Sequence, residues 1–140
     1  MTASGVAKAP FLRSASSLAL SAVLSFFVSQ SAFGTELHQP KPQLRCGWFS
    51  NPTPGNAWLV DRDAEWVVGI QGGHQAEGDW PEFRNGEWVH FNRSYGYGCA
   101  CLNVIADRES LEVKRILSAK PRPLEACKKD PALAKRKPEA

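Results

Sequence analysis

Residues 71–80 bring together the side-chain types that acid–base chemistry or metal binding requires. The segment contains His74, Glu77 and Asp79 among three glycines. An imidazole and two carboxylates can transfer protons or hold a ligand. Their spacing matches no phosphate-binding loop, nucleophile elbow or metalloprotease motif, and it equally suits a glycine-containing turn with solvated carboxylates. We therefore assign no catalytic residue, metal or cofactor, and we take His74, Glu77, Asp79 and Trp80 as candidate ligand-binding residues.

Four cysteines, Cys46, Cys99, Cys101 and Cys127, are the second group with chemical potential. An oxidising compartment favours disulfides over thiols in a chain of this size. Cys99 and Cys101 are two residues apart in a strand-like segment, near the limit for bridging, so each is expected to pair with a distant cysteine. Two arrangements remain open, Cys46–Cys99 with Cys101–Cys127, or Cys46–Cys101 with Cys99–Cys127. The alternative is a redox pair or thiolate metal site, although the usual Cys-x-x-Cys spacing is absent.

All five tryptophans lie within residues 48–88. A small domain can fill its core with indole rings, because each aromatic side chain buries about 150–250 Å². The alternative is an exposed platform formed by Trp80 together with Trp48 or Trp58. Because the aromatic residues come without a catalytic signature, we expect a non-enzymatic binding module that uses the aromatic, glycine-rich loop. The alternative function is a small enzyme, or a redox or metal protein, using His74, Glu77 and Asp79 or the cysteine pair at 99 and 101.

Residues 1–34 have the order of charge and hydropathy that is typical of a cleavable signal peptide. Lys8 and Arg13 precede an apolar run, and small residues, Ala32 and Gly34, stand at the minus-three and minus-one positions before Thr35. The run is shorter than the roughly 20 apolar residues of a spanning helix. The sequence therefore predicts a periplasmic or secreted protein with no membrane span after cleavage.

The charges of the predicted mature chain, residues 35–140, are unevenly distributed. It holds 15 basic and 14 acidic residues, but residues 35–113 contain 6 basic and 11 acidic groups, whereas residues 114–140 contain 9 basic and 3 acidic groups. An acidic body in an exported chain argues against nucleic acid as a partner. The expected partner is a protein, peptide or glycan of the envelope.

Short β-type segments separated by turn residues predict one mainly β domain of a small α+β type, with an antiparallel meander sheet, short C-terminal helical turns and two disulfides. The expected strands cover residues 57–60, 65–71, 87–92, 97–106 and 111–119. The expected helical turns cover residues 124–128 and 131–136, the second with proline at its start. Residues 35–45 are expected to be an extended lead-in without regular structure, residues 46–133 the single domain, and residues 134–140 a frayed basic tail.

The chain contains four short motifs: Arg45–Pro54 with its Cys-Gly-Trp opening, Gln71–Gly73, Gly78–Trp80, and Tyr95–Cys101 with the pattern Gly-Tyr-Gly-Cys-x-Cys. In these motifs the chain resembles a bacterial family catalogued only as a domain of unknown function, over about residues 45–133. Because the members of that family are small exported proteins, the resemblance implies a periplasmic or secreted location. It implies no activity and no catalytic residue.

Overall fold

The computed structural model of this protein describes residues 41–139, so the predicted signal peptide and its cleavage site lie outside the described residues. The described strands are β1 (Gln43–Thr53), β2 (Asn56–Asp61), β3 (Glu65–Gly69), β4 (Trp88–Asn92), β5 (Tyr95–Asp107) and β6 (Glu112–Arg122). Two short helices follow, α1 (Leu124–Lys128) and α2 (Pro131–Ala134). Within residues 41–139, no helix is long and apolar enough to cross a membrane.

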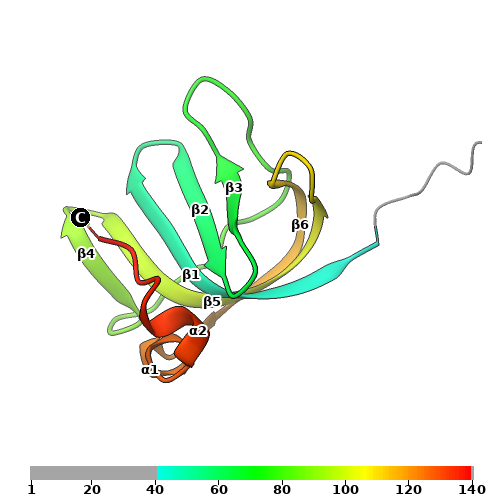
Figure 1. Cartoon of the computed structure of the whole chain (residues 1–140). Helices are drawn as coiled ribbons and strands as arrows, with labels where there is room; N and C mark the ends of the chain where they lie inside the picture. Colours follow the sequence, from blue (N-terminus) through cyan, green and yellow to red (C-terminus); the bar gives the residue numbers. More distant parts are fainter. Residues whose placement is uncertain (1–40, 140) are drawn as a thin grey trace, which may run out of the picture. The chain divides into compact units, whose positions relative to one another are not determined.

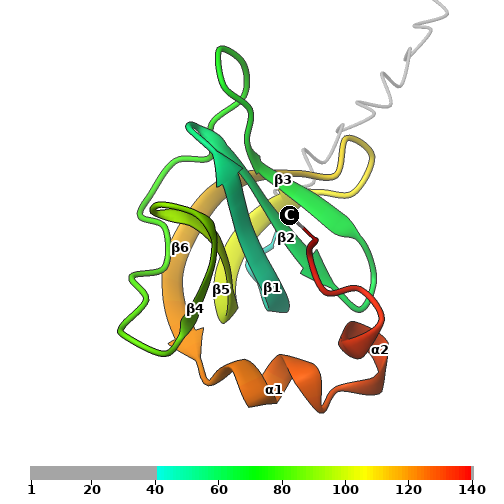
Figure 2. The ribbon, with the colours of Figure 1, turned by 90° about the vertical axis from the view of Figure 1, so that its left-hand side faces the viewer.

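The strands close on themselves as a barrel (Figures 1 and 2). β1 pairs antiparallel with β2 on one edge and with β5 on the other. β3 meets β6 in a parallel contact, Val67 opposite Glu112, and β6 pairs antiparallel with β5. The closed order of the barrel strands is β1-β2-β3-β6-β5, with β5 paired back to β1. Closure pairs strand edges that would otherwise stay open to other chains.

The remaining strand, β4, extends the sheet at one end of the barrel. Trp88 of β4 lies opposite Gly98, whereas the next residue of β5, Cys99, lies opposite Arg122 of β6. β4 therefore continues along the same edge of β5 at the point where β6 ends. This arrangement places the β4–β5 hairpin beside the mouth of the barrel.

The side chains of β5 point alternately into two hydrophobic cores, because successive side chains of a strand face opposite sides of the sheet. Leu102 and Val104 belong to the inner core, with Phe49, Leu59 and Trp66. The outer core covers the opposite face of the sheet and contains, among others, Trp48, Tyr97, Cys99, Cys127 and Leu133.

The two helices supply the cover for the outer core, and Figures 1 and 2 show them together at one end of the strands. Pro131 stands in the first turn of α2, and the side chain of Asp130 caps the helix by accepting a hydrogen bond from the Ala132 amide at 2.9 Å. Trp48, which is fully buried, donates from Nε1 to the carbonyl oxygen of Leu133 at 2.9 Å. The C-terminal elements are thus joined to β1 by both packing and a buried hydrogen bond.

The disulfides are Cys46–Cys101 and Cys99–Cys127, which settles the pairing that the sequence left open. Cys46 of β1 lies directly opposite Cys101 of β5, whereas Cys99 bonds to α1. The expectation that each central cysteine has a distant partner is confirmed. The bridges join residues 55 and 28 positions apart. In the chain-entropy model, loops of these lengths contribute about 4 kcal/mol per bridge.

The mainly β fold class with its two helical turns is confirmed, but the sequence predicts no strand where β1 lies. Gln43 to Arg45 are the first residues of β1 rather than an irregular lead-in. Trp48, Phe49 and Ser50 are buried in succession, so β1 lacks the alternating pattern of a half-buried strand. Gly47 also interrupts it. A Cβ there would come within 2.0 Å of the Val60 carbonyl oxygen, so the close approach of β2 requires glycine.

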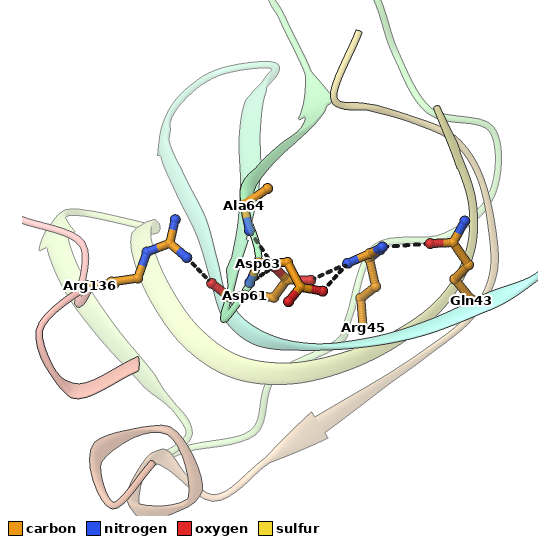
Figure 3. Close-up of polar contacts among 6 residues, drawn as sticks. All are labelled: Gln43, Arg45, Asp61, Asp63, Ala64 and Arg136. Atoms are coloured by element: carbon orange, nitrogen blue, oxygen red, sulfur yellow. Dashed lines mark hydrogen bonds and ion pairs between the residues drawn. The ribbon is translucent and has the colours of Figure 1, made fainter. Parts of the chain in front are cut away.

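A buried ion pair joins the start of β1 to the end of β2 (Figure 3). Arg45 Nη1 lies 2.6 Å from Asp61 Oδ2, and the two residues are only 5% and 3% exposed. The guanidinium also lies 3.8 Å from the ring centroid of Trp66, and its Nη2 donates to Gln43 Oε1 at 2.5 Å. Stacking and hydrogen bonds offset much of the cost of removing the arginine charge from water, although Nε of Arg45 is buried without a hydrogen-bond partner.

Asp61 also organises the turn between β2 and β3 (Figure 3). Its Oδ1 accepts hydrogen bonds from the amides of Asp63 and Ala64, both at 2.8 Å, and its backbone carbonyl accepts one from Arg136. Burial alone would raise the pKa of Asp61, but hydrogen bonds from the Ala64 amide, Arg45 and the Asp63 amide outweigh it. The pKa therefore lies below the ordinary value of 3.8.

Candidate functional site

The candidate residues His74 and Glu77 lie along β6. Because a carbonyl can only accept, His74 donates from Nε2 to the oxygen of Val113 at 2.8 Å. Glu77 pairs its carboxylate with Arg115 Nε at 2.7 Å, and its backbone exchanges hydrogen bonds with Lys114 and Ile116. Both side chains thus have partners that attach the glycine-rich segment to the barrel wall.

Asp79 and Trp80 follow this attachment. Asp79 is exposed, and among the described residues no hydrogen bond or ion pair joins it to His74 or Glu77. Trp80 turns inward and meets Phe49 edge-on, with ring centroids 5.6 Å apart. Of the four candidate binding residues, only Trp80 therefore reaches the larger aromatic group at the barrel mouth.

The platform that the tryptophans were expected to form has different members. Trp48 is fully buried beneath α2 and cannot contact a ligand, and Trp66 lies in the inner core. Trp58 lines a separate hollow beside the C-terminal residues 135–139. Trp80 and Trp88 are only partly buried. Trp48 and Trp66 confirm the expected tryptophan core. The expected platform of Trp80 with Trp48 or Trp58 is wrong, because Trp48 is buried and Trp58 lines another hollow.

Four aromatic rings gather at the mouth of the barrel and line a hollow of about 510 Å³. We call this hollow the aromatic trough. Its aromatic side chains are Phe49, Trp80, Phe83 and Trp88, and its polar rim consists of Asn51, Arg84, Asn85, His90 and Ser94. Phe83 and Trp88 lie at a centroid distance of 4.7 Å with an interplanar angle of 36°. Concave sites with aromatic walls and a few polar groups are typical of ligand pockets, and barrel mouths are a preferred place for them.

Two glycines of β5 make room for these rings. A Cβ on Gly98 would come within 2.4 Å of Phe83 Cε1, and a Cβ on Gly96 within 2.8 Å of Trp88 Nε1. Gly98 of β5 stands opposite Phe49 of β1 and opposite Trp88 of β4. At this position β5 therefore has no side chain between the two aromatic residues. The bare backbone allows the rings to lie against the sheet.

The β4–β5 turn orients two side chains of the trough. Arg93 has a positive φ of 52°, and its carbonyl accepts a hydrogen bond from Nδ1 of His90 at 2.6 Å. The carbonyl of Ser94 accepts one from Nε1 of Trp88 at 3.1 Å. Two successive carbonyls therefore fix the orientation of one imidazole and one indole ring.

The trough is lined by basic side chains and by no acidic ones. Arg84 and His90 line it, and no aspartate or glutamate does. Trp80 also lines a second hollow, together with Asp79 and Glu82 and without any lysine, arginine or histidine. Residues 41–139 contain no group of three or more histidine, cysteine or acidic side chains that could hold a metal ion.

Phe83 and Trp88 were not among the predicted binding residues. The available signal was the alternation of glycine and tyrosine at residues 95–98, because glycine within a strand marks a place where another group approaches the backbone closely. Which group fills that space depends on the path of residues 81–87, which has no periodicity.

Residues 41–134 match the model of a family described as protein of unknown function, DUF4087, and the chain belongs to this family. The matched segment contains the whole aromatic trough and both disulfides. No curated protein and no solved structure matches the chain.

Proposed function

We propose that this protein is an exported, non-enzymatic binding module of the bacterial envelope that holds its ligand in the aromatic trough. The observation that carries the proposal is the partly exposed aromatic surface at the barrel mouth. Partly buried rings of Trp80, Phe83 and Trp88 line an open hollow whose rim is polar. Such surfaces gain free energy when a ligand covers them, since apolar area is removed from water.

The rim supports binding rather than catalysis. General acid–base chemistry needs a proton donor and acceptor that face one reacting group. The trough contains a single imidazole and no carboxylate. His74 and Glu77, which the alternative hypothesis would use, hydrogen-bond to β6 instead. Cys99 and Cys101 each form a disulfide with another partner, which argues against a redox pair made by these two.

Export is supported by the two disulfides together with the predicted signal peptide. All four cysteines are paired, and disulfides persist in oxidising compartments such as the periplasm. Mass spectrometry of the protein recovered from a periplasmic extract checks this part of the proposal. We expect a mature N-terminus at Thr35, and recovery only in the cytosol with reduced cysteines would contradict export.

Isothermal titration with envelope-type probes tests the binding function. The probes are chitotetraose, cellotetraose, a proline-rich peptide and polyphosphate. At least one is expected to bind saturably, and Trp80→Ala is expected to weaken its binding by about tenfold or more, as is typical of a central aromatic contact.

Trp58→Ala is the matched control, because Trp58 is also partly buried but lines the separate hollow near the C-terminus. It should bind like the wild type. Binding that is equally strong in Trp80→Ala, or the absence of saturable binding by every probe, would overturn the proposed function.

A further inference from the structure

The orientation of the Asn51 amide in the trough is set by two backbone carbonyls. Its Nδ2 donates to the oxygen of Thr53 at 2.8 Å and to that of Asn56 at 2.6 Å. Both amide hydrogens are thereby used, since the NH₂ group has only two. The Oδ1 of Asn51 makes no hydrogen bond within the described part of the chain, so it remains an acceptor.

The tautomer of neutral His90 is set in the same way. A carbonyl cannot donate, so the contact between Nδ1 of His90 and the oxygen of Arg93 requires the proton on Nδ1. In the neutral ring the other nitrogen, Nε2, is then an acceptor. The trough thus has two hydrogen-bond acceptors whose roles are fixed by the protein itself.

The remaining polar groups of the rim add donors and groups of mixed character. The guanidinium of Arg84 forms no ion pair within residues 41–139 and can only donate. Asn85 and the hydroxyl of Ser94 can both donate and accept. The indole N–H of Trp88 is already bonded to the Ser94 carbonyl. A matching ligand must therefore offer donors and acceptors side by side.

We propose that the ligand of the aromatic trough is a neutral, hydroxyl-rich saccharide, an inference that rests on the proposed binding function. A hydroxyl group donates and accepts at once, so it can donate to Asn51 or His90 and accept from Arg84. The apolar face of a sugar ring covers the aromatic rings, while its hydroxyl groups reach the polar rim.

Two other ligand classes fit the trough less well. A phosphate-type anion presents only acceptors, which would leave Oδ1 of Asn51 facing it without a donor, and unpaired polar groups are costly. A proline-rich peptide suits aromatic grooves but its prolines have no N–H to donate. The fixed acceptors therefore favour the saccharide over both.

The test compares neutral tetrasaccharides, chitotetraose and cellotetraose, with polyphosphate and a proline-rich peptide by isothermal titration. We expect a tetrasaccharide to bind and the other two to bind at least tenfold more weakly. In His90→Phe the ring is kept but Nε2 is lost, and saccharide binding should weaken by about tenfold, the value of one good hydrogen bond.

His74→Phe is the matched control for this substitution, since His74 also bonds a backbone carbonyl but lies outside the trough. It should leave saccharide binding unchanged, and circular dichroism should show both variants folded. If the tetrasaccharides fail to bind while the peptide or polyphosphate binds in a Trp80-dependent way, the saccharide inference is overturned and the binding function stands. If no probe binds, or if binding is independent of Trp80, both are overturned.

Discussion

Phe83 lies directly against the backbone of Gly98, so closely that a Cβ at residue 98 would come within 2.4 Å of its Cε1. The same Cβ would also lie 2.7 Å from the carbonyl oxygen of Glu87. One glycine in β5 therefore sets the position of both the aromatic ring and the segment that leads into β4.

Gly98→Ala is expected to displace Phe83 and to destabilise the protein by about 1–3 kcal/mol, the usual cost of overpacking. Urea denaturation measures this loss. Gly73→Ala is the control, because a Cβ at residue 73 meets nothing closer than 3.6 Å. It should change the free energy of unfolding by less than about 0.5 kcal/mol. Equal stability of the two variants would contradict the packing of Phe83 on β5.

Removing one partner of the buried ion pair should be far more damaging than removing an exposed carboxylate beside it. Asp61→Asn is expected to cost about 3–5 kcal/mol, because Arg45 would stay buried without its counter-charge. Asp63 also contacts Arg45, at 3.2 Å, but its side chain is 56% exposed. Asp63→Asn should therefore cost less than about 1 kcal/mol. The free energies of unfolding of the two variants, measured at neutral pH, test this difference. Equal losses in Asp61→Asn and Asp63→Asn would contradict the buried ion pair.

The lowered pKa of Asp61 predicts a specific pH dependence of stability. Because the pKa is lower in the folded than in the unfolded state, the contribution of Asp61 is complete above the unfolded value, near 3.8, and is lost as the pH falls through the folded value. The difference in unfolding free energy between wild type and Asp61→Asn should thus shrink below about pH 4. A difference that stays constant, or grows, as the pH falls well below about 4 would argue against the ionised pair.

The two disulfides should differ in their accessibility to reductants. Cys46 is exposed and Cys101 partly so, whereas Cys99 and Cys127 are only 2% and 1% exposed. Under native conditions a mild thiol should therefore reduce Cys46–Cys101 first, since exchange requires access to a sulfur. Alkylation followed by peptide mass spectrometry identifies the labelled cysteines. Earlier labelling at Cys99 or Cys127 would show that α1 does not cover its bridge.

Local patterns in the sequence predicted most elements, while the site depended on long-range packing. Alternation identified β5 and placed both central cysteines on one face, but choosing between the two pairings required the register of Cys46 opposite Cys101. β1 lacked alternation because it is paired on both edges and buried on both faces. The meander also misses the parallel contact between β3 and β6, which no local pattern encodes.

The candidate site shows the same division. Trp80 was expected to lie in a binding loop and does line the trough, but His74 and Glu77 from the same segment attach it to β6. The partners of Trp80 come from a preceding strand, Phe49, and from residues up to eight positions later, Phe83 and Trp88. Side chains this far apart in sequence meet only because β5 brings β1 and β4 together.

The five tryptophan indole N–H groups provide the most direct test of the trough as the binding site. Each gives its own signal in a nitrogen–proton correlation spectrum, and chitotetraose or cellotetraose can be titrated into the labelled protein. The signals of Trp80 and Trp88 should shift with saturation, while those of the buried Trp48 and Trp66 should stay in place. Shifts confined to Trp58, or no shift of Trp80 and Trp88 while a probe binds, would contradict a ligand site at the barrel mouth.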